Sequence, residues 1–505
     1  MKWSSYPVHP LLLAAYPVLT LLNHNIGQVR PILGFRAFAL STVAALGLLV
    51  VLRLIIRSWA TAGLIASLMI VLFYSYGPAY DLLSEVRVAE TSLGRHRYLV
   101  PLWLGFLVIG AILAIRGKRS VTPALNVVAL VAVAIPLVQL LSSELGVRNN
   151  SAEAENLGLE LTAPDPMPDV YYIVLDAYGR QDVLQREFDL DNTNYLSQLE
   201  SLGFQVAGCS MSNYSQTELT FSTALNLNYI NELGDTFTEQ VKDRSEMWPL
   251  IRNSRVRRVF EELGYKTVAF ETGFRWSEFE DADLYLAPPK SGKVGLSVFE
   301  VTLLRSTAAW ALIDQAQTLP EFLARDFDQS AEQHYDRVKF VFDQLEEAAE
   351  ISGPKFVFAH IVSPHPPFIF DPSGGFRDSV ADGGSVTGAE YIEGYRDQVI
   401  YLNGRVEKVV EQLIHTSEVP PIIIVQGDHG PGHGSSTDRM SILNAIRLPG
   451  GGEPFSSSIS PVNTFRLLFD RVFQADLPLL QDESYFSTYD APYDFSLVPI
   501  DCDSE

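Results

Sequence analysis

Two different hydrophobic patterns divide the chain. The first 145 residues hold long, nearly uninterrupted apolar runs, whereas the rest alternates short apolar runs with polar segments. A helix that spans a bilayer needs about 20 mainly apolar residues. Pro10 and Pro17 make the first run the weakest candidate, and no small-residue cleavage site of a signal peptide follows it. We predict about five membrane spans, at residues 8–26, 34–56, 58–77, 98–115 and 121–143.

Basic residues between these runs set the expected orientation, because cytoplasmic loops carry an excess of Lys and Arg. Arg53 and Arg57 follow the second run, and Arg116, Lys118 and Arg119 follow the fourth. The bias is slight, because the opposing loops also contain arginines. Placing the basic loops inside puts the N-terminus in the cytoplasm and everything after the fifth span outside. We therefore expect a multi-pass protein of the plasma (inner) membrane with a large extracytoplasmic part.

The pattern changes after residue 145. Residues 146–168 are polar, acidic and proline-bearing, which is typical of a linker. Beyond them, strand-like and helix-like segments alternate. This alternation predicts an α/β domain over residues 169–505, with a central mixed sheet flanked by helices. The expected strands include 170–175, 266–270, 355–361 and 421–426, and the expected helices include 194–202, 247–263 and 392–415.

Residues 271–350 fit this alternation poorly, and we interpret them as a helix-rich insertion. Within it, residues 292–318 could cover a site or touch the membrane. We favour a surface helix packed on the sheet.

The charge differs between the two parts as well. Residues 1–145 have a net charge of +7, which leaves −30 on residues 146–505. So acidic a domain argues against nucleic acid as a partner. It also means that an anionic substrate would need a local positive centre, which a metal ion would supply. The two cysteines, Cys209 and Cys502, are too few for a disulfide framework and indicate little about the compartment.

The strongest chemical signal is an apolar run of β-branched residues, 422–425, that leads into Asp428-His429-Gly430. Ligand sites in open α/β sheets gather where strands end, and a carboxylate beside an imidazole can bind a metal there. A strand that simply enters a polar turn would look the same. The motif therefore gains weight only from other clusters along the chain.

Three further clusters carry reactive groups. Asp176 follows a predicted strand and precedes Arg180, the stretch 212–220 is rich in Ser and Thr, and His360 and His365 flank the end of another strand. Each has a structural interpretation, such as a turn cap, a helix cap or a polar group beside a proline turn. Their joint occurrence favours a functional site.

The order of these motifs resembles the alkaline phosphatase/sulfatase superfamily. The residues that carry the resemblance are Asp176, then Thr217 at a Ser/Thr-rich helix start, then His365 in Pro-His-Pro-Pro, then Asp428-His429-Gly430. Together with the membrane part, they are similar to membrane-anchored sulfatase-like phosphotransferases. These include lipoteichoic acid synthases, periplasmic glucan phosphoglycerol transferases and lipid A phosphoethanolamine transferases. The resemblance implies a sulfatase-like fold for the α/β domain.

The resemblance also implies roles for individual residues. Thr217 would be the nucleophile, and His360 and His365 would protonate the leaving group or hold phosphate. His433 and Arg180 would add substrate contacts. The implied cofactor is a divalent ion, Mn or Zn with Mg or Ca also compatible, and its ligands would be Asp176, Thr217, Asp428 and His429. Ser212 and Ser215 remain alternative nucleophiles.

Two departures favour phosphoryl over sulfuryl chemistry. Ala177 stands where sulfatases carry a second aspartate, and Cys209 lies in Gly-Cys-Ser-Met instead of Cys-x-Pro-x-Arg. We therefore expect transfer or hydrolysis of a phosphoryl-linked head group, of the phosphoglycerol or phosphoethanolamine type, through a phospho-threonine. The donor would be a membrane phospholipid, and the acceptor a glycan or lipid. A sulfuric or phosphonic ester hydrolase with the same site is one alternative, and a non-catalytic membrane protein with a binding ectodomain is another.

Overall fold

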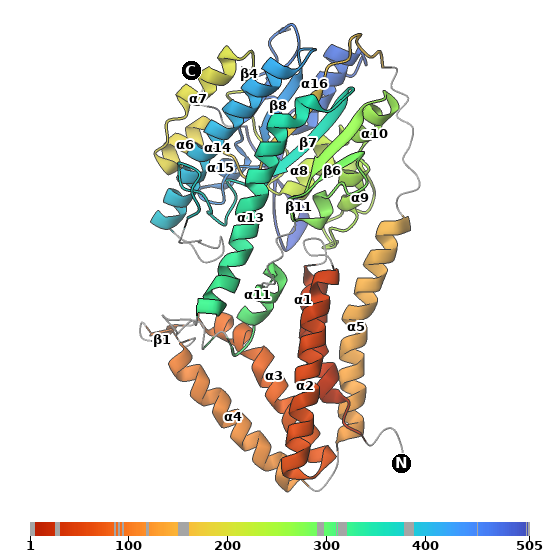
Figure 1. Ribbon diagram of the computed structural model, residues 1–505, viewed down its shortest axis with the longest axis vertical. Coiled ribbons are helices and arrows are strands. Elements are labelled where there is room, and N and C mark those ends of the chain that lie inside the picture. Colours follow the sequence, from red (N-terminus) through yellow and green to blue (C-terminus); the bar gives the residue numbers. More distant parts are fainter. Residues whose placement is uncertain are drawn as a thin grey trace. The chain divides into compact units, whose positions relative to one another are not determined.

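The computed structural model describes residues 6–25, 31–84, 87–88, 91–92, 95–117, 121–149, 161–289, 297–309, 311, 321–377, 388–451, 453–500 and 502. The chain divides into two compact units (Figure 1), Met1–Gly146 with Lys293–Ser330, and Val147–Gly292 with Ala331–Glu505. Of the predicted linker 146–168, residues 150–160 lie outside the described residues.

The first unit is helical. Four of its described helices are long and apolar enough to cross a membrane, over Pro31–Ile56, Trp59–Leu83, His96–Arg116 and Thr122–Ser142. They match the last four predicted spans. The elements of this unit are α1 (His9–His24), η2 (Pro31–Leu33), α2 (Gly34–Ile56), α3 (Trp59–Ser84), β1 (Arg87–Val88), β2 (Thr91–Ser92), α4 (His96–Arg116), α5 (Thr122–Asn149) and α11 (Val298–Arg305).

The first predicted span, 8–26, forms the 16-residue helix α1. At 1.5 Å per residue it is about 24 Å long, which is less than the roughly 30 Å of a bilayer core. It nevertheless packs into the bundle, because Val18, Leu19 and Leu22 are buried in a cluster with Ala37 of α2.

The stretch around α11 belongs to the helical unit, so our favoured interpretation of residues 292–318 as a surface helix of the sheet domain was wrong where they are described. Phe299 and Leu303 are buried in the same cluster as the apolar residues of α1 and α2. The backbone N–H of Gly77 donates to the carbonyl of Ser306 at 3.2 Å, and the N–H of Ala308 donates to that of Phe73 at 2.8 Å. The apolar side chains of this insertion find their partners on the membrane helices.

The second unit is built on a central mixed sheet, as the alternating pattern predicts, and the structure shows that this sheet is mostly parallel. In the described part of the chain this sheet has seven strands in the order β4-β9-β8-β3-β7-β5-β6. β3 lies at its centre and pairs in parallel with β7 and β8, whereas β9 runs antiparallel to β8 and β4. The strands are β3 (Val170–Leu175), β4 (Gln205–Val206), β5 (Lys266–Phe270), β6 (Leu284–Leu286), β7 (Lys355–Ile361), β8 (Ile422–Gly427) and β9 (Asn444–Arg447).

Helices cover both faces of this sheet (Figure 1). Tyr171, Ile173 and Leu175 of β3 pack in a core with α6, α7, α13 and α14, and the alternate residue Tyr172 packs against Phe465 of α16. The helices are α6 (Gln181–Phe188), α7 (Thr193–Ser201), α8 (Thr217–Ala224), η3 (Ile230–Glu232), α9 (Met247–Arg252), α10 (Arg255–Glu262), η4 (Arg275–Ser277), α13 (Glu321–Glu347), η5 (Ala348–Glu350), α14 (Ala389–Thr416), α15 (Ser436–Met440) and α16 (Pro461–Phe473).

One predicted helix, 247–263, is in fact two. α9 ends at Arg252, and the hydroxyl of Ser254 accepts from the N–H of Arg257 to begin α10. Serine is a favoured N-cap residue because its side chain satisfies a free N–H of the first turn. The capping residue therefore breaks the apolar periodicity that we interpreted as continuous.

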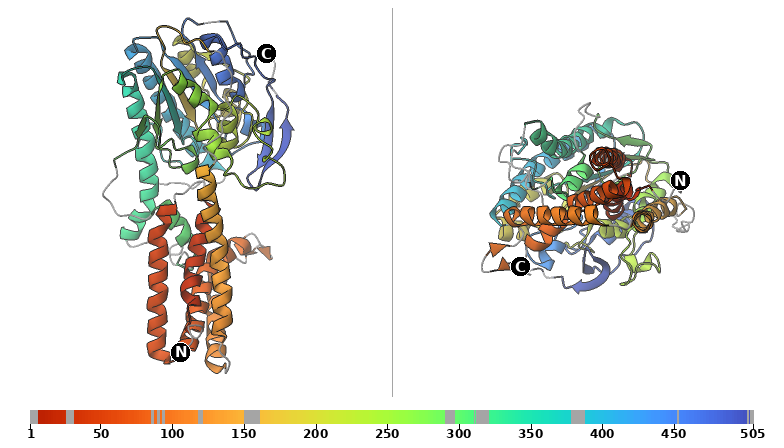
Figure 2. Two further views of the ribbon diagram at one scale, coloured as in Figure 1. Left: turned by 90° about the vertical axis from the view of Figure 1, so that its right-hand side faces the viewer. Right: turned by 90° about the horizontal axis from the view of Figure 1, so that it is seen from below.

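The chain ends in a separate antiparallel hairpin, β10 (Ser484–Thr488) and β11 (Ala491–Val498), shown apart from the central sheet in Figure 2. Just beyond it, Cys502 forms a disulfide with Cys209. This pairing could not be predicted from the sequence, because the two residues are 293 positions apart.

Candidate active site

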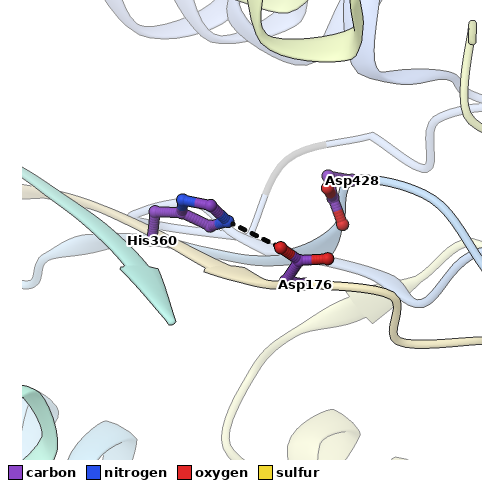
Figure 3. A group of neighbouring side chains, drawn as sticks. All are labelled: Asp176, His360 and Asp428. Atoms are coloured by element: carbon purple, nitrogen blue, oxygen red, sulfur yellow. Dashed lines mark hydrogen bonds and ion pairs between the residues drawn. The ribbon is translucent and has the colours of Figure 1, made fainter. Parts of the chain in front are cut away.

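Three neighbouring parallel strands bring acidic and imidazole groups to one edge of the sheet (Figure 3). Leu175 at the end of β3 pairs with Ile361 of β7 and with Gly427 of β8. Asp176 and Asp428 are therefore the next residues on adjacent strands. His360 pairs with Val174, and since side chains alternate along a strand, it shares a face with Asp176.

These three side chains form a compact group that could hold a metal ion. One ligand atom from each of Asp176, His360 and Asp428 lies within 4.8 Å of the others, and all three residues are buried. The Nε2 of His360 lies 3.3 Å from Oδ2 of Asp176. Among the described residues, Oδ1 of Asp176 and Oδ2 of Asp428 have no hydrogen-bond partner. Two buried carboxylate oxygens without donors fit a bound cation, because burying a charge unpaired is costly.

The turn after β3 is shaped around Asp428. The backbone N–H of Ala177 donates to Oδ1 of Asp428 at 2.9 Å. To do so Ala177 adopts a φ of 67°, a left-handed conformation that costs a non-glycine residue roughly 1 kcal/mol. The buried Tyr395 holds this turn, because its hydroxyl donates to the Ala177 carbonyl at 2.7 Å and accepts from the N–H of Gly179 at 3.0 Å. Strain of this kind is typical of functional sites.

His429 adds a second imidazole at the same place. Its Nε2 lies 3.5 Å from Oδ2 of Asp428 and 3.6 Å from Oδ1 of Asp176. Its Nδ1 lies 2.9 Å from the Gly430 carbonyl. A carbonyl can only accept, so this bond places the proton on Nδ1 and leaves the Nε2 lone pair facing the carboxylates. Burial, assisted by the Arg439 guanidinium, lowers the pKa of His429 to about 4, and the ring is neutral at pH 7.

The carboxylate of Asp176 is charged. Burial alone would raise its pKa, but His365, His360 and His429 nearby outweigh burial and hold the pKa of Asp176 below its usual value. A charged carboxylate and a neutral imidazole are the protonation states that metal ligands require.

Thr217 completes the predicted group. It is the first residue of α8, and its Oγ1 lies 3.2 Å from Nε2 of His429. The free N–H groups at a helix start favour an anion there. The structure thus brings together Asp176, Thr217, His360, Asp428 and His429. The two alternative nucleophiles are already engaged, since the Ser212 hydroxyl donates to the Tyr214 carbonyl and the Ser215 hydroxyl to that of Ser487, both at 2.9 Å.

Arg439 is a member of the site that the sequence analysis missed. Its guanidinium donates to Nε2 of His429 at 3.0 Å, to the Gly430 carbonyl at 3.1 Å and to the Ser215 carbonyl at 3.0 Å. The approach depends on Gly430, where a Cβ would lie 2.1 Å from the carbonyl oxygen of Asp438. Gly430 was the one feature of the sequence that could have indicated this, because a glycine there allows α15 to pack closely on the end of β8 and brings the guanidinium of Arg439 to the site.

The remaining predicted residues differ in their support. The N–H of His365 donates to the Asp176 carbonyl at 3.0 Å, so its backbone is attached to the site. His433 lies 3.8 Å from Glu187 and is 37% exposed. The guanidinium of Arg180 binds Asp182 at 2.6 Å and reaches the Ser210 carbonyl at 3.4 Å. These contacts do not test the predicted substrate roles of His433 and Arg180, which stay predictions.

The family model described as Sulfatase matches residues 168–458. No curated protein matches the chain. Among solved structures, the C-terminal periplasmic domain of EcEptC from Escherichia coli in complex with Zn is similar at 12% identity and a TM-score of 0.42, over 69% of this chain and 97% of that one.

Two further solved structures are similar at the same level. The yidJ protein from Bacteroides fragilis has 14% identity and a TM-score of 0.40, over 66% of this chain and 84% of that one. BT1596, a 2-O GAG sulfatase, has 12% identity and a TM-score of 0.38, over 62% and 72%.

Proposed function

The chain belongs to the sulfatase family, and from this premise we propose that it is a membrane-anchored enzyme that transfers or hydrolyses a phosphoryl-linked head group. The observation that carries the proposal is the position of Thr217, whose Oγ1 lies 3.2 Å from Nε2 of His429 beside two buried carboxylates. A hydroxyl at a helix start, next to a site for a cation, is arranged for nucleophilic attack on an anionic ester.

Asp176, Asp428 and His429 would hold a divalent cation, with Thr217 as a further ligand. The structure adds His360, which we had expected to protonate the leaving group or to hold phosphate, as another group within reach. When bound, such an ion lowers the pKa of a ligated hydroxyl and stabilises charge on phosphoryl oxygens. Carboxylate and imidazole ligands suit Mn²⁺ or Zn²⁺.

The residues of the chain then have distinct tasks. Thr217 loses its hydroxyl proton to water, its Oγ1 attacks phosphorus in line and forms an Oγ1–phosphorus bond, and the bond from phosphorus to the leaving oxygen breaks. His365 or His360, in its protonated form, gives that oxygen a proton. The same histidine, now neutral, takes a proton from an acceptor hydroxyl or water, whose oxygen attacks phosphorus; the Oγ1–phosphorus bond breaks and Thr217 regains a proton from water. Arg439 and the N–H groups of α8 stabilise the anion throughout.

Phosphoryl chemistry is favoured over sulfuryl chemistry. A threonine occupies the nucleophile position, and Cys209 is joined to Cys502 instead of standing in a Cys-x-Pro-x-Arg motif. A sulfuric or phosphonic ester hydrolase would use the same groups and is the second candidate. A non-catalytic binding ectodomain is disfavoured, because a chain released from catalysis should have lost one of Asp176, Thr217, Asp428 and His429.

The surroundings indicate where the reaction takes place. Four described helices are long and apolar enough to anchor the chain in a membrane, and the Cys209–Cys502 disulfide suits an oxidising compartment. We place the protein in the plasma (inner) membrane with the catalytic unit extracytoplasmic. A site tethered there suits a phospholipid as donor and a glycan or lipid as acceptor.

The test uses the full-length protein in detergent, loaded with Mn²⁺ or Zn²⁺. It is assayed on aryl phosphodiester, phosphomonoester and sulfate esters beside Thr217→Ala. We expect phosphodiester cleavage that the variant loses by at least a thousandfold, and a phosphorylated peptide containing Thr217 in a quenched wild-type reaction. Thr193→Ala is the matched control, since Thr193 also begins a helix but is exposed.

Each of the other possible outcomes of this assay would give the site a different function. Preferred cleavage of sulfate esters would select the second candidate. Turnover that survives Thr217→Ala would reject the nucleophile. Bound metal without turnover on any ester would select a binding role.

A further inference from the structure

Thr217 lies outside the sheet that fixes the other groups, and Arg244 contacts the residues on both sides of it. The guanidinium of Arg244 donates to Oε2 of Glu218 at 2.6 Å and to Oε1 of Gln216. The side chains of Arg244 and Glu218 are only 11% and 10% exposed. One planar cation therefore holds the two neighbours of the proposed nucleophile, which a guanidinium can do because its donors point in fixed directions.

The same arginine is attached to the C-terminal hairpin. Its guanidinium donates to the carbonyl of Tyr489 at 3.0 Å and lies 3.8 Å from the centroid of the Tyr489 ring. A cation over an aromatic face is attracted by the ring. Tyr489 is in the turn between β10 and β11, so Arg244 joins the start of α8 to the tip of the hairpin.

A second set of bonds runs directly between the hairpin and the loop before Thr217. The Gln216 amide donates to the Ser487 hydroxyl at 2.9 Å and to the Thr488 carbonyl at 3.1 Å. The hydroxyl of Ser215 donates to the Ser487 carbonyl at 2.9 Å and accepts from its N–H at 3.2 Å. The hairpin thus binds the last two residues before the nucleophile through both side chains and backbone.

The beginning of the loop that precedes Thr217 is also attached to the hairpin and to the residues after it. The N–H of Tyr485 donates to the Asn213 carbonyl at 2.8 Å. The disulfide joins Cys209, eight residues before Thr217, to Cys502, four residues after β11. Both ends of the segment 209–218 are therefore attached to the region 483–502.

We propose that Arg244 is a positioning residue for Thr217 and that it acts with the β10–β11 hairpin as a clamp on the segment 209–218. The inference rests on the proposed function, in which Thr217 is the nucleophile. Arg244 also balances the buried carboxylate of Glu218, one residue from where an anionic ester would bind. Without Arg244 that carboxylate would be buried and unpaired, and its charge would oppose the phosphoryl group.

The experiment is a double-mutant cycle in the full-length protein, with Arg244→Gln, Glu218→Gln and the pair together. We expect Arg244→Gln to lower kcat at least tenfold with KM changed by less than about threefold, since the substrate-binding groups remain. The double variant should recover part of that loss because no unpaired charge is left. Arg244→Lys should be intermediate, because an ammonium restores the charge but not the fork of donors.

The matched control is Arg405→Gln. Arg405 is on α14, is also partly buried, and binds two acidic residues of α13, Asp343 at 2.8 Å and Glu346 at 3.0 Å, away from Thr217. Hydrogen exchange supplies a readout that does not depend on turnover. Amides of the segment 209–218 should exchange faster in Arg244→Gln and at the wild-type rate in Arg405→Gln.

The outcomes separate this inference from the proposed function. If wild-type turnover depends on Thr217 but Arg244→Gln keeps kcat within twofold, the clamp is rejected and the function stands. An equal loss of kcat in Arg405→Gln would also reject it, since the effect would be general destabilisation. If the wild type shows no turnover that depends on Thr217, the function fails, and unchanged exchange of segment 209–218 in Arg244→Gln would reject the clamp as well.

Discussion

The two halves of the site are held in place by different means. Asp176, His360 and Asp428 come from three adjacent strands of one sheet, whose register sets their spacing. Thr217 begins a short helix outside that sheet. It depends on a hairpin about 270 residues further along the chain, as the bond between Ser215 and Ser487 shows.

One half of the site is therefore rigid, because its residues belong to the central sheet. The other half is a loop that contacts with the C-terminal hairpin hold in place. Backbone pairing between buried strands is cooperative and resists local opening, whereas a loop tied by side chains opens at a lower free energy. We infer that the sheet determines whether an ion can bind, and that the attached loop determines whether the nucleophile is in place.

The largest expected effect comes from the rigid half. Asp428→Asn keeps the oxygen that accepts from Ala177 but removes the charge. We expect turnover to fall by about a thousandfold or more, because several kcal/mol of charge stabilisation would be lost with the ion. Thermal unfolding with and without Mn²⁺ checks the cause, since a bound ion should raise the Tm of the wild type much more than that of the variant.

The metal-free Asp428→Asn protein should be at least as stable as the metal-free wild type, because two buried carboxylates repel each other. Asp169→Asn is the control at the opposite end of β3, where Asp169 pairs with Lys355 at 2.5 Å. It should lose stability and keep the response to Mn²⁺. A wild-type response in Asp428→Asn would mean that the ion binds elsewhere.

An intermediate effect should come from Arg439, which joins the two halves. Its guanidinium binds the Gly430 carbonyl on the sheet side and the Ser215 carbonyl on the loop side. We expect Arg439→Gln to lower kcat/KM by about a hundredfold, as removing one donor to a developing anion commonly does. Steady-state kinetics on the phosphodiester would measure it.

Arg447→Gln is the control for that prediction. Arg447 lies on β9 and binds only backbone carbonyls among the contacts described, those of Leu202 at 3.0 Å and Pro421 at 2.7 Å. Equal losses in the two variants would show that Arg439 stabilises the fold and does not bind the anion.

The smallest effect should come from His433. Its ring is 37% exposed beside Glu187 and packs near Phe188 and Tyr391. We expect His433→Ala to change kcat/KM by less than about twofold, because the ring contacts none of the groups that surround Thr217. A tenfold rise in KM would support the substrate-binding role that the sequence suggested.

The sequence predicted the sheet, and placed acidic and imidazole groups at its strand ends, because both are local signals. A β-branched run that ends in Asp-His-Gly marks a strand end, and parallel strand ends meet at one edge. Asp176, Asp428 and His429 stood out from these local patterns and from the order of motifs that carries the family resemblance, and the structure brings the three residues together. The mixed sheet flanked by helices was confirmed for the same reason, since alternating strands and helices leave few other arrangements.

What the sequence could not show depends on contacts between distant segments. Arg439, Arg244 and the Cys209–Cys502 disulfide gain their meaning only after folding brings them to the site. The insertion around α11 was misjudged because an apolar helix face packs equally well on a sheet or on other helices, and the pattern alone does not identify its partner. The length of α1 differed from the prediction because hydropathy counts residues and does not detect where a helix ends.

The way the backbone is divided between the two units has a practical result for handling this protein. The chain passes from one unit to the other at three places, 146/147, 292/293 and 330/331. A protease that cuts only at 146/147 leaves the catalytic unit joined to the helical unit by the other two connections of the chain. A soluble fragment that starts at residue 147 would contain Phe299 and Leu303 but not the helices that bury these two side chains. Release of an intact catalytic unit therefore requires excision of residues 293–330 as well as cleavage at the first passage.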